Sequence, residues 1–373
     1  MQIPPVKIEF SPEDRAEILR RMDRCLSEGQ VAQGKNVLEF EETFARFVGT
    51  RHAVAVSSGG AALEVAMRLL GVKDREVLVP TNTFIATATG VLLAGGQIRF
   101  VDADPRTFGV SLASLQVAVT PKTVGVIVVH IGGIITPEMA AIRAWCDSRG
   151  LWLFEDAAHA HGSTFNGKKA GRFGQAGAYS FFATKVMTSG EGGMLVTDDE
   201  SLAQRARGLR DYGKSDPWVS FHTEIGSNWR MSEFCAVVGL VHLRRLDKFV
   251  AWRKKISDFY TAQLKAIPEI TPVLPTDLSS GYKYIVLLPN GVDRDRFRAA
   301  MKAQGVGLSG GVYDTPLHRQ PVFQQMKPGS FPVADDICSR HICLPLYYGM
   351  TDTQARYVVE ALRSTLLEKE VHS

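Results

Sequence analysis

Short apolar runs alternate with longer amphipathic stretches between residues 50 and 200. The apolar runs are HAVAVSS, EVLVP, QIRFVDAD, VGVIVVHI, GLWLFEDAA, GAYSFF and GMLVTD. Several are apolar at nearly every position, which is typical of strands that are covered on both faces. The stretches between them, such as 61–70 and 137–149, have helical spacing, and Pro137 suits the first turn of a helix. This alternation predicts an α/β protein with a mostly parallel central sheet.

The pattern changes after residue 232. Residues 232–267 contain no proline and keep helical apolar spacing, so they predict one or two long helices that leave the sheet. The next segment, PEITPVLPTDLSSGY, contains three prolines and is typical of a connector. After it, YKYIVLLPN, DRFRAAMKAQG and TDTQARYVVEALRSTL predict a strand, a helix and a closing helix of a smaller α/β domain. We therefore predict a large domain over 1–245 and a small C-terminal domain over 246–373.

Composition and charge narrow the class of protein. The 43 basic and 39 acidic residues give a net charge of +4 without a long basic run, so no nucleic-acid partner is indicated. No stretch approaches the roughly eighteen apolar residues of a membrane span, and the N-terminus lacks the apolar segment of a signal peptide. The cysteines are odd in number and lack metal-ligand spacing; they are Cys25, Cys146, Cys235, Cys338 and Cys343. We expect reduced thiols and a cytoplasmic protein that binds neither nucleic acid nor membranes.

A glycine-rich turn follows the first apolar run, in AVAVSSGGAALEVAMRLLG. A strand that ends at Ser57 and Ser58 and a helix that opens near Ala61 would place free backbone amides at the positive end of a helix dipole. Such a turn binds anions, and the glycines let a phosphate approach the backbone. Many strand-to-helix turns are glycine-rich for steric reasons alone, so this segment leaves both interpretations open.

A second polar group stands at the end of a strongly apolar run, in LWLFEDAAHAHG. Glu155 and Asp156 take the position that faces the ligand crevice in open α/β sheets. A carboxylate buried there needs a partner, although a helix cap or a structural salt bridge would also explain it. His159 and His161 follow, but no further ligands stand at a recognisable spacing, so we predict no metal site.

One lysine stands among small and apolar residues in SFFATKVMTSGEGG. Lys185 is either a solvated loop charge or a desolvated amine with a lowered pKa, which could bond covalently to a carbonyl carbon. A tethering lysine, an aspartate for a pyridinium nitrogen and a helix N-terminus for a phosphate are together what pyridoxal phosphate requires. Their combination on one α/β chain favours the second interpretation.

The chain resembles the DegT/StrS-type sugar aminotransferases, a pyridoxal-phosphate family of fold type I. The resemblance covers nearly the whole length and rests on GQVAQGKNVLEFEETFARFVGTRHAVAVSSGGAAL, EVLVPTNTFIATATGVLLAGGQIRFVDAD, EDAAHAHGSTFNGKKAG, SFFATKVMTSGEGG, GSNWRMSEFCAVVGL and ICLPLYYGMT. It implies a large domain with a mostly parallel seven-stranded sheet and a smaller C-terminal α/β domain. Some relatives have histidine in place of the lysine and dehydrate their substrates, whereas this chain has Lys185.

The resemblance also implies roles for the residues around the cofactor ring. Lys185 would hold the cofactor covalently and then move the proton between substrate and cofactor carbons. Asp156 would keep the ring nitrogen protonated, and His159 would bind the phenolic oxygen of the ring. Phe84 would stack on one face of the ring and Ala158 would contact the other.

Four further residues match positions that hold the phosphate in this family. The amides of Gly60 and Ala61 and the hydroxyl of Ser180 would bind it within one chain. Asn228, in GSNWRM, resembles an asparagine that reaches the phosphate from a neighbouring subunit. The resemblance therefore implies a homodimer with shared active sites. Many relatives have threonine where this chain has Gly60, so one hydroxyl donor is missing here.

The expected activity is transfer of an amino group from an amino acid, L-glutamate, to a keto group on a sugar. The acceptor implied by the family is a nucleotide-linked keto-deoxysugar used in polysaccharide or natural-product biosynthesis. A keto-cyclitol acceptor, or another pyridoxal-phosphate activity such as a lyase or aldolase, remains as an alternative. GGVYDTPLHRQP resembles the segment that approaches the substrate, with Tyr313 and His318 as candidate contacts or as ordinary loop residues.

Overall fold

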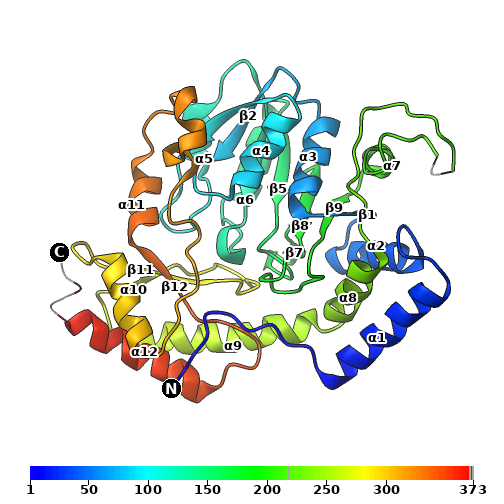
Figure 1. The fold of residues 1–373 in the computed structure, drawn as a ribbon. Helices are drawn as coiled ribbons and strands as arrows, with labels where there is room; N and C mark the ends of the chain where they lie inside the picture. Colours follow the sequence, from blue (N-terminus) through cyan, green and yellow to red (C-terminus); the bar gives the residue numbers. More distant parts are fainter. Residues whose placement is uncertain (217, 369–370, 372–373) are drawn as a thin grey trace.

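A seven-stranded sheet forms the centre of the computed structural model, which describes residues 1–216, 218–368 and 371 (Figure 1). The strand order is β1-β9-β8-β5-β4-β2-β3, and β9 alone among these seven runs antiparallel to its neighbours. Each strand overlaps one of the seven predicted runs, which confirms the predicted fold class. The strands are β1 (His52–Val56), β2 (Glu76–Pro80), β3 (Gln97–Val101), β4 (Thr123–Val129), β5 (Trp152–Asp156), β8 (Ala176–Ser180) and β9 (Gly193–Thr197).

Helices cover both faces of this sheet, as buried parallel strands require. One face packs against α3 (Gly59–Leu69), α4 (Ile85–Leu93) and α7 (Glu200–Leu209). The other packs against α2 (Lys35–Val48), α5 (Leu112–Ala118), α6 (Met139–Ser148) and α8 (Glu233–Leu243), with α1 (Pro12–Ser27) on α8. The predicted helices at 61–70 and 137–149 correspond to α3 and α6. A short hairpin, β6 (Thr164–Phe165) with β7 (Lys168–Lys169), follows β5.

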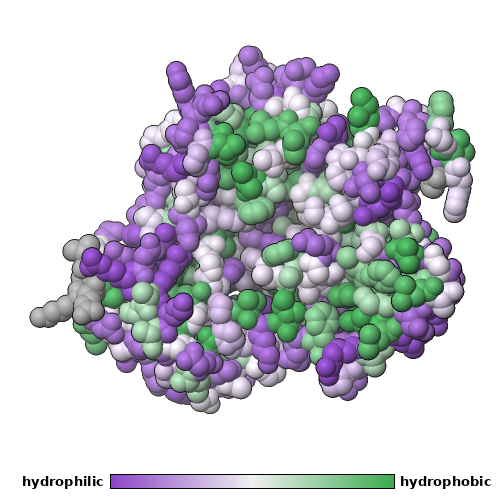
Figure 2. Space-filling view, viewed as in Figure 1, coloured by the Kyte–Doolittle hydropathy of each residue, from purple (hydrophilic) through white to green (hydrophobic). Residues whose placement is uncertain are grey.

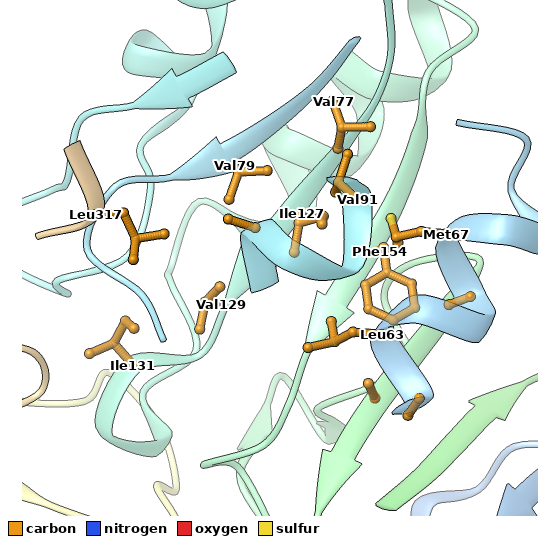
Figure 3. Close-up of a cluster of buried hydrophobic side chains, with 14 of the residues drawn as sticks. Leu63, Met67, Val77, Val79, Val91, Ile127, Val129, Ile131, Phe154 and Leu317 are labelled. Atoms are coloured by element: carbon orange, nitrogen blue, oxygen red, sulfur yellow. The ribbon is translucent and has the colours of Figure 1, made fainter. Parts of the chain in front are cut away.

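Apolar side chains from α3, α4 and the central strands interlock on the first face (Figure 3). Leu63 and Met67 of α3 meet Phe154 of β5, and Val91 of α4 lies over Val77 of β2. Phe154 and Met67 are fully buried. Truncation of such an aromatic side chain to alanine costs about 3–5 kcal/mol, because a cavity remains in a close-packed interior. This packing fixes the N-terminus of α3 against the sheet.

The C-terminal part of the chain forms a second core beside the sheet (Figure 1). Here β11 pairs with β10 and with β12, and Ile3 from the N-terminus joins the same core through a bridge to Val306. Residues 1–10 thus contact the C-terminal part, while the predicted boundary at residue 245 remains a prediction. The elements are α9 (Leu246–Leu264), β10 (Thr271–Pro272), β11 (Tyr284–Leu287), α10 (Arg294–Ala303), α11 (Pro332–Arg340), β12 (His341–Leu344) and α12 (Asp352–Leu367).

The sheet topology brings the ends of six strands to one edge. All strands of the sheet except β9 run in the same direction, so their carboxyl ends lie on the same side. In open α/β sheets this edge is where ligands bind. The predicted polar residues at the ends of β1, β5 and β8 therefore meet there.

Candidate active site

Asp156 is the last residue of β5 and is 5% exposed. Thr87 of α4 donates a hydrogen bond of 2.8 Å to its Oδ2 atom, and the Ala158 amide donates to Oδ1 at 3.2 Å. Burial raises the pKa of Asp156, whereas these two hydrogen bonds favour its charged form. A carboxylate held in this way is oriented by neutral donors, and a cationic ligand beside it would stabilise its charge.

Lys185 lies in a turn after β8, where its amide donates to the Phe182 carbonyl at 2.9 Å. Its Nζ atom lies 4.8 Å from the centre of the Tyr282 ring. Burial lowers the pKa of Lys185 to about 8, although the nearby Asp156 acts in the opposite direction. About a tenth of the amine would then be unprotonated at pH 7, and such an amine can act as a nucleophile and as a base. The structure thus favours the functional interpretation of this lysine.

The N-terminus of α3 forms a cradle next to Ser180. A Cβ atom at Gly59 would lie 2.7 Å from the Cβ of Ser180, whereas one at Gly60 would meet nothing closer than 3.7 Å. The Ala61 amide donates to the Ser58 side chain at 3.1 Å, which caps the helix. Among the described residues, no acceptor takes the amides of Gly59 and Gly60. Two free amides at a helix N-terminus beside a hydroxyl fit a phosphate group.

The predicted ring-binding residues lie around the same edge. Phe84 precedes α4 and is 56% exposed, with its ring centroid 6.1 Å from that of Tyr313. His159 is buried and stacks on Tyr282 at 4.2 Å, and its Nε2 atom lies 3.3 Å from the Tyr313 hydroxyl. Burial lowers the pKa of His159 well below its usual value, so the ring is neutral. Ala158 is half-buried, two residues beyond Asp156.

The three remaining predicted residues have different surroundings. Asn228 is exposed on the segment after α7, where it forms a bridge with Asp211. Tyr313 lies between His159 and Phe84, within reach of a ligand at the site.

His318 is 2% exposed, and both of its ring nitrogens have partners, Thr81 at 2.8 Å and Asp335 at 3.0 Å. Neither nitrogen is free to contact a substrate in this structure. The same Thr81 hydroxyl also accepts a hydrogen bond from the His318 amide, so this histidine joins its segment to the end of β2.

Several residues at the site were not predicted from the sequence. Thr87 lies in the quoted segment TNTFIATATG, but nothing in its spacing marked it as a partner of Asp156. Tyr282 ends the proline-rich segment that the sequence predicts as a connector, and Lys283 lies at the start of the predicted strand that follows it. The sequence predicted that the amides of Gly60 and Ala61 bind the phosphate, but in the structure the Ala61 amide caps the helix and the Gly59 amide is available instead.

Among the residues that the structure describes, no group of three or more His, Cys, Asp or Glu side chains is arranged to hold a metal ion. Within the same residues, none of the helices combines the length and the hydrophobicity that crossing a bilayer requires.

Comparison with known proteins gives consistent matches over nearly the whole chain. Residues 12–363 match the family model described as the DegT/DnrJ/EryC1/StrS aminotransferase family. The chain is 36% identical over 367 residues to the spore coat polysaccharide biosynthesis protein SpsC of Bacillus subtilis, covering 93% of this chain and 94% of the relative. It is 32% identical to the UDP-N-acetyl-3-dehydro-alpha-D-glucosamine 3-aminotransferase of Acidithiobacillus ferrooxidans, covering 97% and 96% of the two chains.

A solved structure adds a cofactor to this comparison. The crystal structure of NtdA from Bacillus subtilis with its cofactor PMP bound superposes with a TM-score of 0.89 at 25% identity. The match covers 96% of this chain and 83% of the other.

Proposed function

Because the chain belongs to the DegT/DnrJ/EryC1/StrS aminotransferase family, we propose that it transfers an amino group from L-glutamate to the keto group of a nucleotide-linked deoxysugar. Membership in this family makes the protein an enzyme, an aminotransferase that uses pyridoxal phosphate. One observation carries the proposal: the half-buried amine of Lys185, with its pKa lowered to about 8, lies within electrostatic reach of the buried carboxylate of Asp156. This pairing supports a site in which Lys185 transfers protons and Asp156 stabilises a cationic ring.

The substrate class is supported by the relatives. One is named as an aminotransferase of a UDP-linked 3-dehydro sugar, and another as a polysaccharide biosynthesis protein. Both align over more than nine-tenths of this chain. We therefore assign to this chain a nucleotide-linked keto sugar as acceptor and a role in the supply of amino sugars for polysaccharides.

The residues at the sheet edge fit the cofactor. The free amides of Gly59 and Gly60, with the Ser180 hydroxyl, would hold its phosphate, and the exposed ring of Phe84 would stack on its ring. Asp156 would pair with its ring nitrogen. When bound, pyridoxal phosphate supplies a carbonyl carbon that carries the amino group and a ring that withdraws electrons from the bonds beside it.

The residues of this chain then have distinct tasks. Lys185 takes up and releases a proton at Nζ, which its lowered pKa permits near neutral pH. Asp156 presents a negative charge in a site shielded from water, where a charge-assisted hydrogen bond is strong. Thr87 fixes the orientation of that carboxylate. His159, which is neutral, accepts a hydrogen bond from the Gly132 amide at Nδ1 and presents its Nε2 atom to the Tyr313 hydroxyl.

We also propose a homodimer in which Asn228 of one subunit completes the phosphate site of the other. Asn228 is exposed on the loop after α7, which projects from the body of the chain in Figure 1. Large apolar side chains are exposed on this loop, among them Trp218 at 95% and Ile225 at 88%. Figure 2 shows further apolar groups over α4, where Leu93 is 62% exposed. Exposed apolar surface of this extent is typical of a protein–protein interface.

A cytoplasmic location is part of the proposal. All five cysteines are free thiols, and burial raises the pKa of Cys146 and Cys338 to about 12. Thiols that stay reduced are typical of proteins in a reducing compartment.

A two-step assay tests the proposed function. The holoenzyme is first mixed with L-glutamate alone, and conversion of the cofactor to its amino form is followed by absorbance. A panel of nucleotide-linked keto sugars and keto-cyclitols is then added, and recovery of the original absorbance identifies the acceptor class. The assignment would be contradicted if the original absorbance recovered only with keto-cyclitols. It would also be contradicted if the enzyme catalysed elimination or carbon–carbon cleavage without amino transfer.

A further inference from the structure

Three cationic side chains gather around Tyr282: Arg253 is buried, and Lys185 and Lys283 are half-buried. The ammonium groups of Lys185 and Lys283 lie 4.8 Å and 5.3 Å from the centre of its ring. Arg253 is 4% exposed, and its Nη1 atom donates to the carbonyl oxygens of Gly281 at 3.0 Å and Leu346 at 2.7 Å. In the described part of the chain, none of the three forms an ion pair with a carboxylate. Lys185 has Asp156 within electrostatic reach, whereas the buried Arg253 guanidinium and the half-buried Lys283 amine have no carboxylate partner among the described residues.

The carboxylates nearest to this group have other partners. Asp156 is bound by Thr87 and Ala158 and serves the ring nitrogen in the proposed function. Asp314 accepts two hydrogen bonds from Arg298, at 2.8 Å and 2.9 Å. Burial lowers the pKa of Lys283 and lowers that of Arg253 to about 10, because charged groups lose solvation there. Buried charges are normally paired, so an unmatched cluster beside an active site indicates a missing anion.

A cavity of about 160 Å³ opens beside these cations. Lys283, Arg253 and Tyr282 line it together with Thr184, which is the neighbour of Lys185 in the chain. Its remaining walls include the apolar residues Val6 and Leu346. The Nε atom of Arg253 has no hydrogen-bond partner among the described residues. The cavity thus combines a cationic side, an apolar side and a wall, Tyr282, whose ring also lies 4.8 Å from the Nζ atom of Lys185.

We propose that this Lys283 cavity binds a carboxylate of the amino-acid donor, an inference that rests on the proposed function. The size of the cavity agrees with a small ligand, since sites for larger ligands span about 300–1,000 Å³. The apolar wall suits the methylene groups of a dicarboxylic amino acid, and Lys283 and Arg253 suit its carboxylate. A nucleotide-linked sugar is much larger than the cavity, so its diphosphate is the less favoured anion.

Steady-state kinetics of the holoenzyme test this site. Lys283→Met removes the charge and keeps the length of the side chain, and Lys265→Met makes the same change at an exposed lysine. Loss of a hydrogen bond to a charged group weakens binding about ten- to a hundredfold. We expect Lys283→Met to raise KM for L-glutamate by that factor and to change KM for the keto sugar less than about twofold. Lys265→Met should change neither.

A binding measurement that does not depend on turnover accompanies the kinetics. Calorimetric titration with glutarate, a dicarboxylate without an amino group, should give a Kd that rises by the same factor in Lys283→Met. If that variant does not fold, Lys283→Gln replaces it. Unchanged glutamate and glutarate affinity would overturn the proposal, and so would a rise in KM confined to the keto sugar. Failure of wild-type enzyme to accept an amino group from any amino acid would instead refute the proposed function.

Discussion

Thr87 of α4 donates a hydrogen bond of 2.8 Å to Asp156 at the end of β5, and both side chains are buried. The two residues are 69 positions apart in the sequence. The contact shows that α4 positions the carboxylate as well as covering the sheet. It also connects Asp156 to Thr83, whose hydroxyl lies 2.8 Å from that of Thr87.

Thr87→Val should therefore slow the reaction without removing a group that contacts the substrate. Valine has nearly the same shape but cannot donate, so Asp156 loses its main orienting bond. We expect kcat to fall about tenfold or more, because a hydrogen bond to a charged group contributes roughly 1.5–3 kcal/mol. Thr89→Val is the matched control, since the Thr89 hydroxyl only caps a carbonyl of its own helix. Thr87→Ser should restore the rate, and a normal rate in Thr87→Val would contradict the orienting role.

Asp156→Asn should have a larger effect than Thr87→Val. The amide keeps the shape of the side chain but cannot hold a proton on the ring nitrogen. Loss of a preorganised electrostatic group costs about a hundredfold or more in kcat. The exposed Asp258 provides a control, as Asp258→Asn should leave kcat unchanged. A near-normal rate in Asp156→Asn would mean that another group neutralises the ring.

The amine of Lys185 should reduce the stability of the cofactor-free protein. Its pKa falls from 10.5 in the unfolded chain to about 8 in the folded one, so the unfolded state binds more protons between those values. The free energy of unfolding should therefore rise as the pH increases from about 8 to 10.5. Below pH 8 the buried ammonium is destabilising in full.

Lys185→Met should consequently stabilise the cofactor-free protein at pH 7, by roughly 1–3 kcal/mol after allowance for partial solvation. This advantage should shrink as the pH approaches 10.5. Urea unfolding at pH 7 and pH 10 measures both, with Lys265→Met as the control. Equal stability of the wild type and Lys185→Met at pH 7 would show that the amine is not desolvated.

Mixed dimers test the shared-site proposal for Asn228. Pairing an Asn228→Ala chain with a Lys185→Ala chain places both defects in one site and leaves the other intact, if Asn228 acts on the neighbouring subunit. Such dimers should recover close to half of the wild-type activity. If Asn228 acts within its own chain, each site carries one defect, and activity will not exceed the mean of the two single variants.

Much of this architecture is predictable from local pattern. The apolar runs gave all seven strands of the central sheet, and strand-end position with residue type pointed to Asp156 and Lys185. These signals work because buried parallel strands must be apolar and because ligands gather at their carboxyl ends.

Contacts between distant segments were not predictable in the same way. Nothing near Tyr282 indicates that its ring stacks on His159, since that contact depends on how the connector returns to the sheet. The bridge between Ile3 and Val306 was unpredictable for the same reason, because it too joins segments that are distant in the sequence. His318 was a candidate contact by resemblance, yet its nitrogens bind Thr81 and Asp335, a fact that only the tertiary structure reveals.

The most direct measurement of the central claim is the visible absorbance of holoenzyme mixed with L-glutamate, in wild type and in Lys185→Ala. In the wild type, the cofactor should convert to its amino form, and a nucleotide-linked keto sugar should reverse the change. Lys185→Ala, which lacks the amine that attaches the cofactor and moves the proton, should show neither conversion nor reversal, and Lys185→Arg should not rescue it. Amino transfer by Lys185→Ala at a substantial fraction of the wild-type rate, without added amine, would contradict the account.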